Sequence, residues 1–398
     1  MTPRLVALVA AVVGCGLLGP GCSDPEKKIE YAPYEGSPAY PDRRPKLPAP
    51  KGTFAFVSDS YSDTVSVLDV PSNEVVAQVP VGRDPVGIDG PHHLAVDRDG
   101  NVYVALSYPQ PTTLPGPHAA HASATRPGFV QKLAKDDLHP IGQVQIDPNP
   151  GEIVISPDGT KVVVTHFDLA RALDPLLSAP DQRANLMIID PTTLVPSGSP
   201  SPTSLRVCRA PHGASIAPDS RTAYVACYAD DAIAVVDLAS PETPPVMIPA
   251  GSKGPYSAVL SPSGRYVAVG NTDGRDTRIL DTQTRTFADA AVPTQGAPYF
   301  ATWANDESKL WIPTQGPDAI VLADRQTGAA LKQRPFGPDC IKPHEAQLAP
   351  DAGVVYLVCE GDHVKASVVL ALDPATLETR ATMNVGVYPD RIGFARKP

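Results

Sequence analysis

The chain has 398 residues, with 47 prolines, 30 glycines and a formal net charge of −10 at pH 7. Prolines and glycines interrupt it at short intervals and leave no long amphipathic helical stretch, so we expect an all-β protein. The repeated part of the sequence has no cluster of Lys and Arg, which argues against a nucleic-acid partner and against an anionic membrane surface.

The first residues have the pattern of a targeting segment. Arg4 precedes an apolar run over residues 5–18, and Cys22 stands where the sequence turns polar. This run is shorter than the about 20 residues that a membrane-spanning helix needs, so we predict a secretory signal peptide over 1–21. Cys22 resembles the cysteine of a bacterial lipobox, which implies cleavage before it and lipid attachment to it. Cys15 is the alternative lipidation site, and ordinary cleavage without a lipid is a third interpretation.

A lipid on Cys22 would anchor the protein to a membrane of the cell envelope, at the periplasmic or the outer-membrane surface. Ser23 directly after it resembles an outer-membrane sorting signal. Residues 22–50 are rich in proline and charge, and we expect them to form an extended tether.

Seven copies of one pattern follow over residues 51–398. Each has a proline turn, an apolar strand, a turn similar to Pro-Asp-Gly and a second strand; third and fourth strands follow, as in 64–69 and 74–82. The last four spacings between turn prolines are 43 to 46 residues. The turn prolines are Pro91, Pro150, Pro211, Pro255, Pro298, Pro343 and Pro389. The expected second strands are 53–58, 102–106, 161–165, 222–227, 265–270, 309–314 and 354–359.

Seven copies of four antiparallel strands predict a seven-bladed β-propeller, a fold that leaves only short, protected sheet edges. The first copy lacks its opening strand, and the last copy, 389–395, consists of that strand alone. We therefore expect the C-terminal strand to close the ring by completing the first blade.

Several segments resemble the YVTN-type (YncE-like) β-propeller repeat of bacterial and archaeal surface proteins. They are Thr64-Val65-Ser66-Val67-Leu68-Asp69, Pro157-Asp158-Gly159 with Val162-Val163-Val164-Thr165, and Tyr224-Val225-Ala226. The resemblance implies an extracytoplasmic binding or scaffold protein, with lactonases and metal or haem oxidoreductases as distant relatives. The sequence contains no Cys-x-x-Cys-His, so covalent c-type haem is not indicated.

Recurrent aspartates end the third strands, and we expect them to cap turns, because Asp accepts hydrogen bonds from the backbone two residues on. They are Asp69, Asp190, Asp237, Asp281, Asp324 and Asp373. The run from Asp97 to Asn101 resembles the start of a calcium loop but lacks the later Glu, so we expect a turn there too.

Four cysteines form two similar pairs. Cys208 and Cys227 are 19 residues apart, and so are Cys340 and Cys359, at matching places in two copies. Each pair should lie at one end of a hairpin, which predicts two disulfides within single blades in an exported protein. Buried free thiols are the alternative.

Histidines carry the strongest chemical signal. His92, His212 and His344 directly follow turn prolines in three copies, where other copies have Tyr256, Tyr299 and Asp390. Strand order places eight of the nine histidines on one face, where the ring that contains His92, His212 and His344 could surround the mouth of the central channel. Imidazoles on separate loops can bind Zn, Cu or Fe, so His92, His212 and His344 form a candidate transition-metal site. The alternative is that Pro-His is simply part of the repeated turn. The expected ligand-binding face comprises His92, His93, Glu152, His166, His212, Tyr256, Tyr299, His344, Glu345, Asp390 and Arg391.

Two long insertions, 107–128 and 166–183, should emerge on the same face and could wall a cleft over the channel. The first could instead be mobile decoration, whereas 169–177 could form a short helix, which makes the second the better lid. We expect a monomeric envelope lipoprotein whose insertion-bearing face binds a protein, glycan or small molecule. The alternative is a metal-dependent oxidoreductase or lactonase-like hydrolase that uses the three histidines with Glu152, Glu345 or Arg391.

Overall fold

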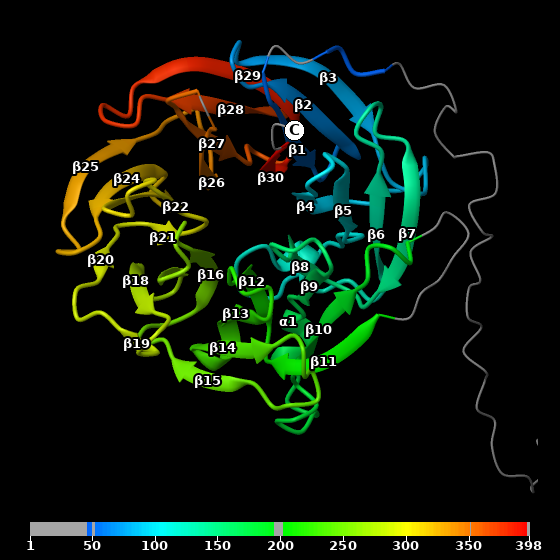
Figure 1. The fold of residues 1–398 in the computed structure, drawn as a ribbon, viewed down its shortest axis with the longest axis vertical. Coiled ribbons are helices and arrows are strands. Elements are labelled where there is room, and N and C mark those ends of the chain that lie inside the picture. The colour runs from blue at the N-terminus through cyan, green and yellow to red at the C-terminus, as the bar shows by residue number, and fades with distance from the viewer. Residues whose placement is uncertain (1–45, 50–51, 195–201, 351, 396–398) are drawn as a thin grey trace, which may run out of the picture. The chain divides into compact units, whose positions relative to one another are not determined.

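The computed structural model describes residues 46–49, 52–194, 202–350 and 352–395, all within the compact unit Tyr34–Pro398. They form seven antiparallel sheets around a central channel, which confirms the predicted seven-bladed β-propeller (Figure 1). The predicted signal peptide, Cys15, Cys22 and most of the tether lie outside the described residues. None of the helices in the described ranges is both long and apolar enough to cross a membrane.

Six blades run from an inner to an outer strand in chain order, whereas the first blade takes its inner strand from the C-terminal end. The inner strands are β30 (Pro389–Phe394), β4 (Pro91–Val96), β8 (Pro150–Ile155), β12 (Pro211–Ile216), β16 (Pro255–Leu260), β21 (Ala297–Pro298) with β22 (Thr302–Trp303), and β26 (Pro343–Leu348). The second strands are β1 (Phe54–Asp59), β5 (Val102–Leu106), β9 (Val162–His166), β13 (Thr222–Cys227), β17 (Tyr266–Asn271), β23 (Lys309–Gln315) and β27 (Val355–Cys359).

The third strands are β2 (Thr64–Asp69), β6 (Gly128–Leu133), β10 (Ala184–Ile189), β14 (Ala232–Asp237), β18 (Asp276–Asp281), β24 (Ala319–Asp324) and β28 (Ala366–Leu372). The outer strands are β3 (Glu74–Pro80), β7 (Pro140–Ile146), β11 (Thr203–Cys208), β15 (Val246–Pro249), β19 (Thr286–Phe287) with β20 (Val292–Pro293), β25 (Ala330–Pro335) and β29 (Thr379–Val387). Short helices are η1 (Ala119–His121), α1 (Leu169–Ala172) and η2 (Tyr228–Asp230). The predicted second strands agree with these bounds to within one residue.

The C-terminal strand closes the ring as predicted. β30 pairs antiparallel with β1, with Ala55 opposite Phe394 and Val57 opposite Ile392. The first blade is therefore built from both ends of the propeller, in the sheet order β3-β2-β1-β30.

Strand alternation builds the core between blades. In β1, Phe54 and Phe56 pack toward the second blade, whereas Ala55 and Val57 pack toward the last one. Each of the seven interfaces between neighbouring blades has such an apolar cluster among the described residues. Successive side chains of a strand point to opposite faces of its sheet, so every blade contributes to two clusters. The clusters therefore join all seven blades into one ring of apolar contacts.

Both predicted disulfides are present, Cys208–Cys227 and Cys340–Cys359. Their expected placement within one blade is wrong for the first pair. Cys208 is the last residue of β11 in the third blade, whereas Cys227 ends β13 in the fourth, so this disulfide ties two blades together. The prediction failed because β11, the outer strand of the third blade, extends to Cys208, only three residues before the repeat proline Pro211.

The recurrent aspartates cap turns as predicted. Asp190, Asp237, Asp281, Asp324 and Asp373 each accept a hydrogen bond from a backbone N–H two or three residues on. Asp69 likewise accepts a hydrogen bond from the Ser72 hydroxyl. The carboxylate of Asp97 accepts from the backbone N–H of Asp99 and of Asn101, so that segment is also a turn.

Candidate functional site

The inner strands present two rings of side chains to the channel. In six blades a register shift falls near the repeat proline or its pairing partner, which re-aims the following residues inward. The residues directly after the prolines are His92, Gly151, His212, Tyr256, Tyr299, His344 and Asp390. The next residues are His93, Glu152, Gly213, Ser257, Phe300, Glu345 and Arg391. The histidines therefore belong to inner strands and are buried, rather than decorating an exposed turn.

The first insertion, 107–128, brings two more histidines into the channel. His121 ends η1 and is buried, and the side chain of His118, the residue before η1, is only 4% exposed. Asn149 fixes the insertion, because its side-chain amide accepts a hydrogen bond from Ala124 N and donates one to Ala124 O. The expectation of mobile decoration is therefore not what the described contacts show.

The second insertion forms the expected short helix, α1, and packs against the first. Leu169 N donates a hydrogen bond to Ala122 O, and both side chains join an apolar cluster that includes Tyr256 and Phe300. Both insertions thus cover the channel mouth, but the first supplies the polar groups. The second contributes mainly apolar side chains that pack against the first.

The imidazoles form one continuous cluster. The ring of His92 lies 4.4 Å from that of His93 and stacks on that of His121 at 4.3 Å. The His93 and His212 rings are 5.5 Å apart, and the His118 ring stacks on that of His344 at 4.7 Å.

A glycine lets the inner strand that carries His212 lie close to the next inner strand, which carries Tyr256. A Cβ on Gly213 would lie 2.7 Å from Ser257 Cα and 2.8 Å from Tyr256 O, so only glycine lets the two inner strands come this near. Tyr256 then stacks on His212 with ring centroids 3.8 Å apart.

Several imidazoles are anchored through Nδ1 and leave Nε2 without a partner. His93 Nδ1 lies 3.1 Å from Glu152 Oε1, His121 Nδ1 lies 2.8 Å from Ser107 Oγ, and His344 Nδ1 lies 2.9 Å from Asp390 O. In the described part of the chain, the buried Nε2 atoms of these three residues and of His212 have no hydrogen-bond partner. Buried polar atoms without partners are rare in native proteins, and metal-binding histidines commonly have their other nitrogen held in this way.

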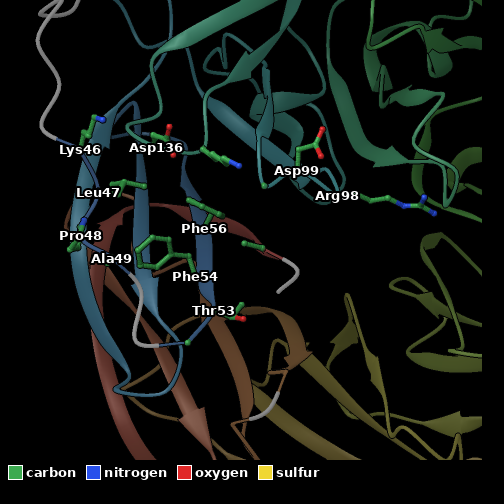
Figure 2. A pocket seen from close by; sticks show the side chains of 14 residues that line it. Lys46, Leu47, Pro48, Ala49, Thr53, Phe54, Phe56, Arg98, Asp99 and Asp136 are labelled. Atoms are coloured by element: carbon green, nitrogen blue, oxygen red, sulfur yellow. The ribbon is translucent and has the colours of Figure 1, made fainter. Parts of the chain in front are cut away.

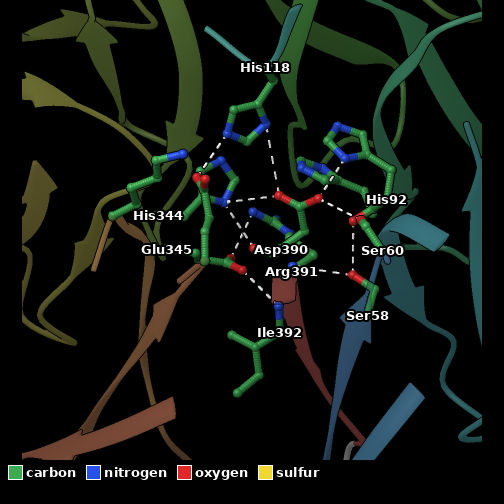
Figure 3. A network of polar contacts seen from close by, with 12 residues as sticks. Ser58, Ser60, His92, His118, His344, Glu345, Asp390, Arg391 and Ile392 are labelled. Atoms are coloured by element: carbon green, nitrogen blue, oxygen red, sulfur yellow. Dashed lines mark hydrogen bonds and ion pairs between the residues drawn. The ribbon is translucent and has the colours of Figure 1, made fainter. Parts of the chain in front are cut away.

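Asp390 lies between two sets of imidazoles (Figure 3). Its Oδ2 is 2.7 Å from His92 Nδ1 and accepts a hydrogen bond from Ser60 Oγ at 2.8 Å. Its Oδ1 faces His344 Nδ1 at 3.6 Å and His118 Nδ1 at 3.9 Å. A second buried carboxylate, Glu360, contacts His118 Nε2 at 2.8 Å and His363 Nε2 at 2.9 Å.

A charged layer adjoins the imidazoles. Arg391 Nη1 lies 2.7 Å from Glu345 Oε1, and Arg391 Nε lies 3.6 Å from Glu152 Oε1. Glu345 Oε2 also accepts the backbone N–H of Ile392 at 2.7 Å (Figure 3). This arginine lies against two buried carboxyl groups, one of which orients His93.

Burial keeps most of these imidazoles neutral near pH 7. Burial lowers the pKa of His93, His121 and His212 well below the usual imidazole value, and neighbouring imidazoles lower it further. Burial and His118 together lower the pKa of His344 to about 4. Neutral imidazoles are the form that binds metal ions.

The carboxylates of Asp390 and Glu360 remain ionised although they are buried. Burial would raise the pKa of Asp390, but the neighbouring His92 holds it below its usual range. Burial also opposes ionisation of Glu360, yet contacts with His118 and His363 hold its pKa well below the usual value.

Three groups of side chains each have ligand atoms that all lie within 4.8 Å of one another among the described residues. They are His92, His93 and His212; His118, His344, Glu360 and Asp390; and His92, His121 and Asp390. The structure thus divides the predicted trio, with His92 and His212 in one group and His344 in another. His166 stands apart from these groups, because its Nδ1 contacts the backbone oxygen of Asn185 in its own blade.

Sequence reasoning did not select His118, His121 or Glu360 as ligands. The two histidines lie in an insertion without a counterpart in other copies, and Glu360 directly follows β27. A usable signal was the close spacing of His118 and His121 in a segment otherwise rich in Pro, Ala and Thr.

A separate cavity of about 600 Å³ lies at the opposite ends of the strands (Figure 2). Leu47 and Pro48 line it together with Phe54, Phe56 and the turn residue Arg98. Leu47 N donates a hydrogen bond to Asp136 O, so the end of the predicted tether lies against the propeller. The lining residues that the structure describes include no histidine.

Solved structures with the same fold come from several bacteria. A protein of unknown function from Desulfotomaculum acetoxidans is similar with a TM-score of 0.60 and 13% identity, covering 87% of this chain and 99% of that one. A periplasmic gluconolactonase of Pseudomonas aeruginosa is similar with a TM-score of 0.62 and 16% identity, covering 87% of this chain and 100% of that one. AztD from Citrobacter koseri is similar with a TM-score of 0.55 and 13% identity, covering 86% of this chain and 98% of that one. At these identities the likeness shows the fold alone.

The sequence matches no protein-family model and no curated protein. The resemblance to the YVTN-type repeat therefore stays a prediction, while the seven-bladed architecture is established by the sheets themselves.

Proposed function

We propose that this protein is a cell-envelope β-propeller that binds a transition-metal ion in its central channel through His92, His93 and His212. One observation carries the proposal: the Nε2 atoms of His93 and His212 are buried without a hydrogen-bond partner within the described residues, beside the imidazole of His92. His92 is held through Nδ1 by Asp390, which leaves its Nε2 for an ion.

The alternative, that these imidazoles simply fill the core, leaves several buried polar atoms unsatisfied. Each such atom costs about 1 to 3 kcal/mol, a penalty that a bound ion removes. Neutral imidazoles suit Zn, Cu, Ni and Fe. A tetrahedral ion about 2.1 Å from each nitrogen spaces them about 3.4 Å apart, so small side-chain movements from the present 4.8 Å limit suffice.

Binding is favoured over catalysis because the two insertions cover the channel mouth, with Ala122 and Leu169 buried where a substrate would enter. A closed site suits an ion better than a sugar lactone. We therefore rank the oxidoreductase and lactonase-like alternatives second.

Zinc titration of chelator-treated protein, in competition with a chromophoric chelator, tests the proposal. The His93→Ala/His212→Ala variant should bind zinc at least about 100-fold more weakly than the wild type. His139→Ala is the matched control, since His139 is 52% exposed on the opposite face, and its affinity should equal that of the wild type. A wild type without tight zinc, nickel or copper binding, or an unaffected double variant, would overturn the proposal.

We also propose that a lipid on Cys22 anchors the protein in the cell envelope and that its repeats belong with the YVTN-type, YncE-like propellers. The apolar run before Cys22 supports export, and two disulfides suit an oxidising compartment. Labelled palmitate should be incorporated by the wild type and by Cys15→Ala, and not by Cys22→Ala. Absence of label from the wild type would contradict the anchor without affecting the metal site.

A further inference from the structure

A second group of potential ligands lies beside the first and has a different composition. His118, His344, Glu360 and Asp390 each offer one ligand atom, and these atoms all lie within 4.8 Å of one another. The residues come from four separate segments: the first insertion, β26, the connection after β27, and β30. Their convergence therefore depends on closure of the ring and on the position of the insertion.

This second group combines two imidazoles with two ionised carboxylates, a ligand set that carries negative charge and attracts a divalent cation. Its polar atoms are not all satisfied: His344 Nε2, His118 Nδ1 and Asp390 Oδ1 are buried without a hydrogen-bond partner in the described chain. Glu360 is supported from behind by Gln315 Nε2, which donates to Oε1 at 2.7 Å. The group thus has ligands as well as residues that orient them.

We infer that the channel holds a second divalent-cation position, formed by His118, His344, Glu360 and Asp390, and that Asp390 couples it to the first. This inference rests on the proposed metal-binding function. The two oxygens of Asp390 face different groups, since Oδ2 contacts His92 at 2.7 Å while Oδ1 faces His344 at 3.6 Å. Asp390 would thus bind the second ion through Oδ1 while it orients, through Oδ2, the His92 ligand of the first.

The second position also links ion binding to closure of the first insertion. His118 belongs to that insertion, whereas His344, Glu360 and Asp390 belong to the body of the propeller. An ion held by both parts fastens the insertion over the channel and over any ion bound at His92, His93 and His212. An ion can then enter or leave the first position only after the ion at the second position has left.

The experiment is a zinc titration of the full chain that counts bound equivalents and measures the affinity of each. The wild type should bind two equivalents. Glu360→Gln and His118→Ala should each retain one at nearly wild-type affinity and bind the second at least about 100-fold more weakly. Asp362→Asn, an exposed residue of the same connection, is the control and should retain both equivalents.

The outcomes separate this inference from the proposed function. A wild type that binds one equivalent, lost in His93→Ala/His212→Ala and kept in Glu360→Gln, overturns the second position alone. A wild type that binds none overturns both. Hydrogen exchange gives an independent readout on the wild type: amides of 107–128 should become at least about tenfold more protected with the second equivalent, and unchanged exchange contradicts the fastening role.

Discussion

The two faces of this propeller differ in where their carboxylates obtain their partners. On the face of the first-to-second and third-to-fourth turns, hydrogen bonds from Ser156 and Thr160 lower the pKa of exposed Asp158 to about 2. Backbone hydrogen bonds from Thr376 and Ala375 lower that of Asp373 to about 2 as well. On the channel face, burial raises the pKa of Asp59 to about 7 and that of Glu152 to about 8. Burial acts on Asp390 and Glu360 too, but neighbouring histidines hold the pKa of both below the usual range.

The origin of these partners distinguishes polar groups that stabilise a turn from polar groups that could bind a ligand. A turn aspartate obtains its partners from its own neighbours in the chain, so it is satisfied wherever the repeat is placed. A channel residue depends on partners from other blades, and several channel nitrogens have none in the described structure. Buried, unpartnered groups that share one location are the ones to suspect of binding a ligand.

The largest expected effect comes from the buried arginine of the channel face. Arg391→Ala leaves Glu345 and Glu152, both at most 1% exposed, without their cation. We expect a loss of about 3 to 5 kcal/mol in the free energy of unfolding, measured by urea denaturation.

The matched substitution on the turn face is Arg221→Ala, which removes an exposed pair with Asp237. This substitution should lower the free energy of unfolding by about 0.5 kcal/mol. Equal losses for the two arginines would remove the distinction between the faces.

The disulfides at the channel face should contribute the next largest effect. Replacing Cys208 and Cys227 by alanine removes a link between the third and fourth blades across a 19-residue separation. We expect a loss of about 3 kcal/mol, visible as a lower melting temperature in calorimetry. Addition of a reductant should then affect the variant less than the wild type; an equal response would mean that this bond does not stabilise the ring.

Asp59 and Asp158, one from each face, should change stability with pH in opposite directions. The folded-state pKa of Asp59 is about 7, above its usual 3.8, so folded protein binds this proton more tightly than unfolded protein does. Its contribution is therefore present at low pH and is lost as pH rises from about 4 through 7. Asp59→Asn should flatten the decline in unfolding free energy between about pH 4 and 7.

Asp158 should behave in the reverse way. Its pKa of about 2 means that its stabilisation is full above pH 3.8 and disappears as pH falls toward 2. Asp158→Asn should thus change acid stability and leave the range from pH 5 to 8 untouched, as unfolding curves at each pH would reveal. A changed slope near neutrality in this variant would contradict the assignment.

A small effect is also expected at a single turn. Asp324 accepts hydrogen bonds from the N–H and the hydroxyl of Thr327, each at 2.8 Å. Asp324→Ala should cost about 0.5 to 1 kcal/mol in unfolding free energy and leave zinc binding unchanged. A change in zinc affinity would show that the two faces are coupled.

Most of the fold could be predicted from the sequence, and part of the candidate site. The strands, ring closure and cysteine pairs follow from repeated local patterns, and the positions after the turn prolines identified His92, His212 and His344 as members of one ring. The interblade character of Cys208–Cys227 was missed, because the turn pattern does not say how far the outer strand β11 extends. His118 and His121 were missed as ligands, because no repeat specifies where their insertion runs.

By itself, the sequence determined the number of blades and the order of strands, since turn residues and apolar alternation act between neighbours in the chain. Only the tertiary structure decided which histidines meet. Their grouping depends on distances across the channel, on the bulges that re-aim the inner strands, and on an insertion held by Asn149 of the adjacent blade. Contacts between residues more than 200 positions apart, such as His92 with Asp390, exist only once the ring has closed.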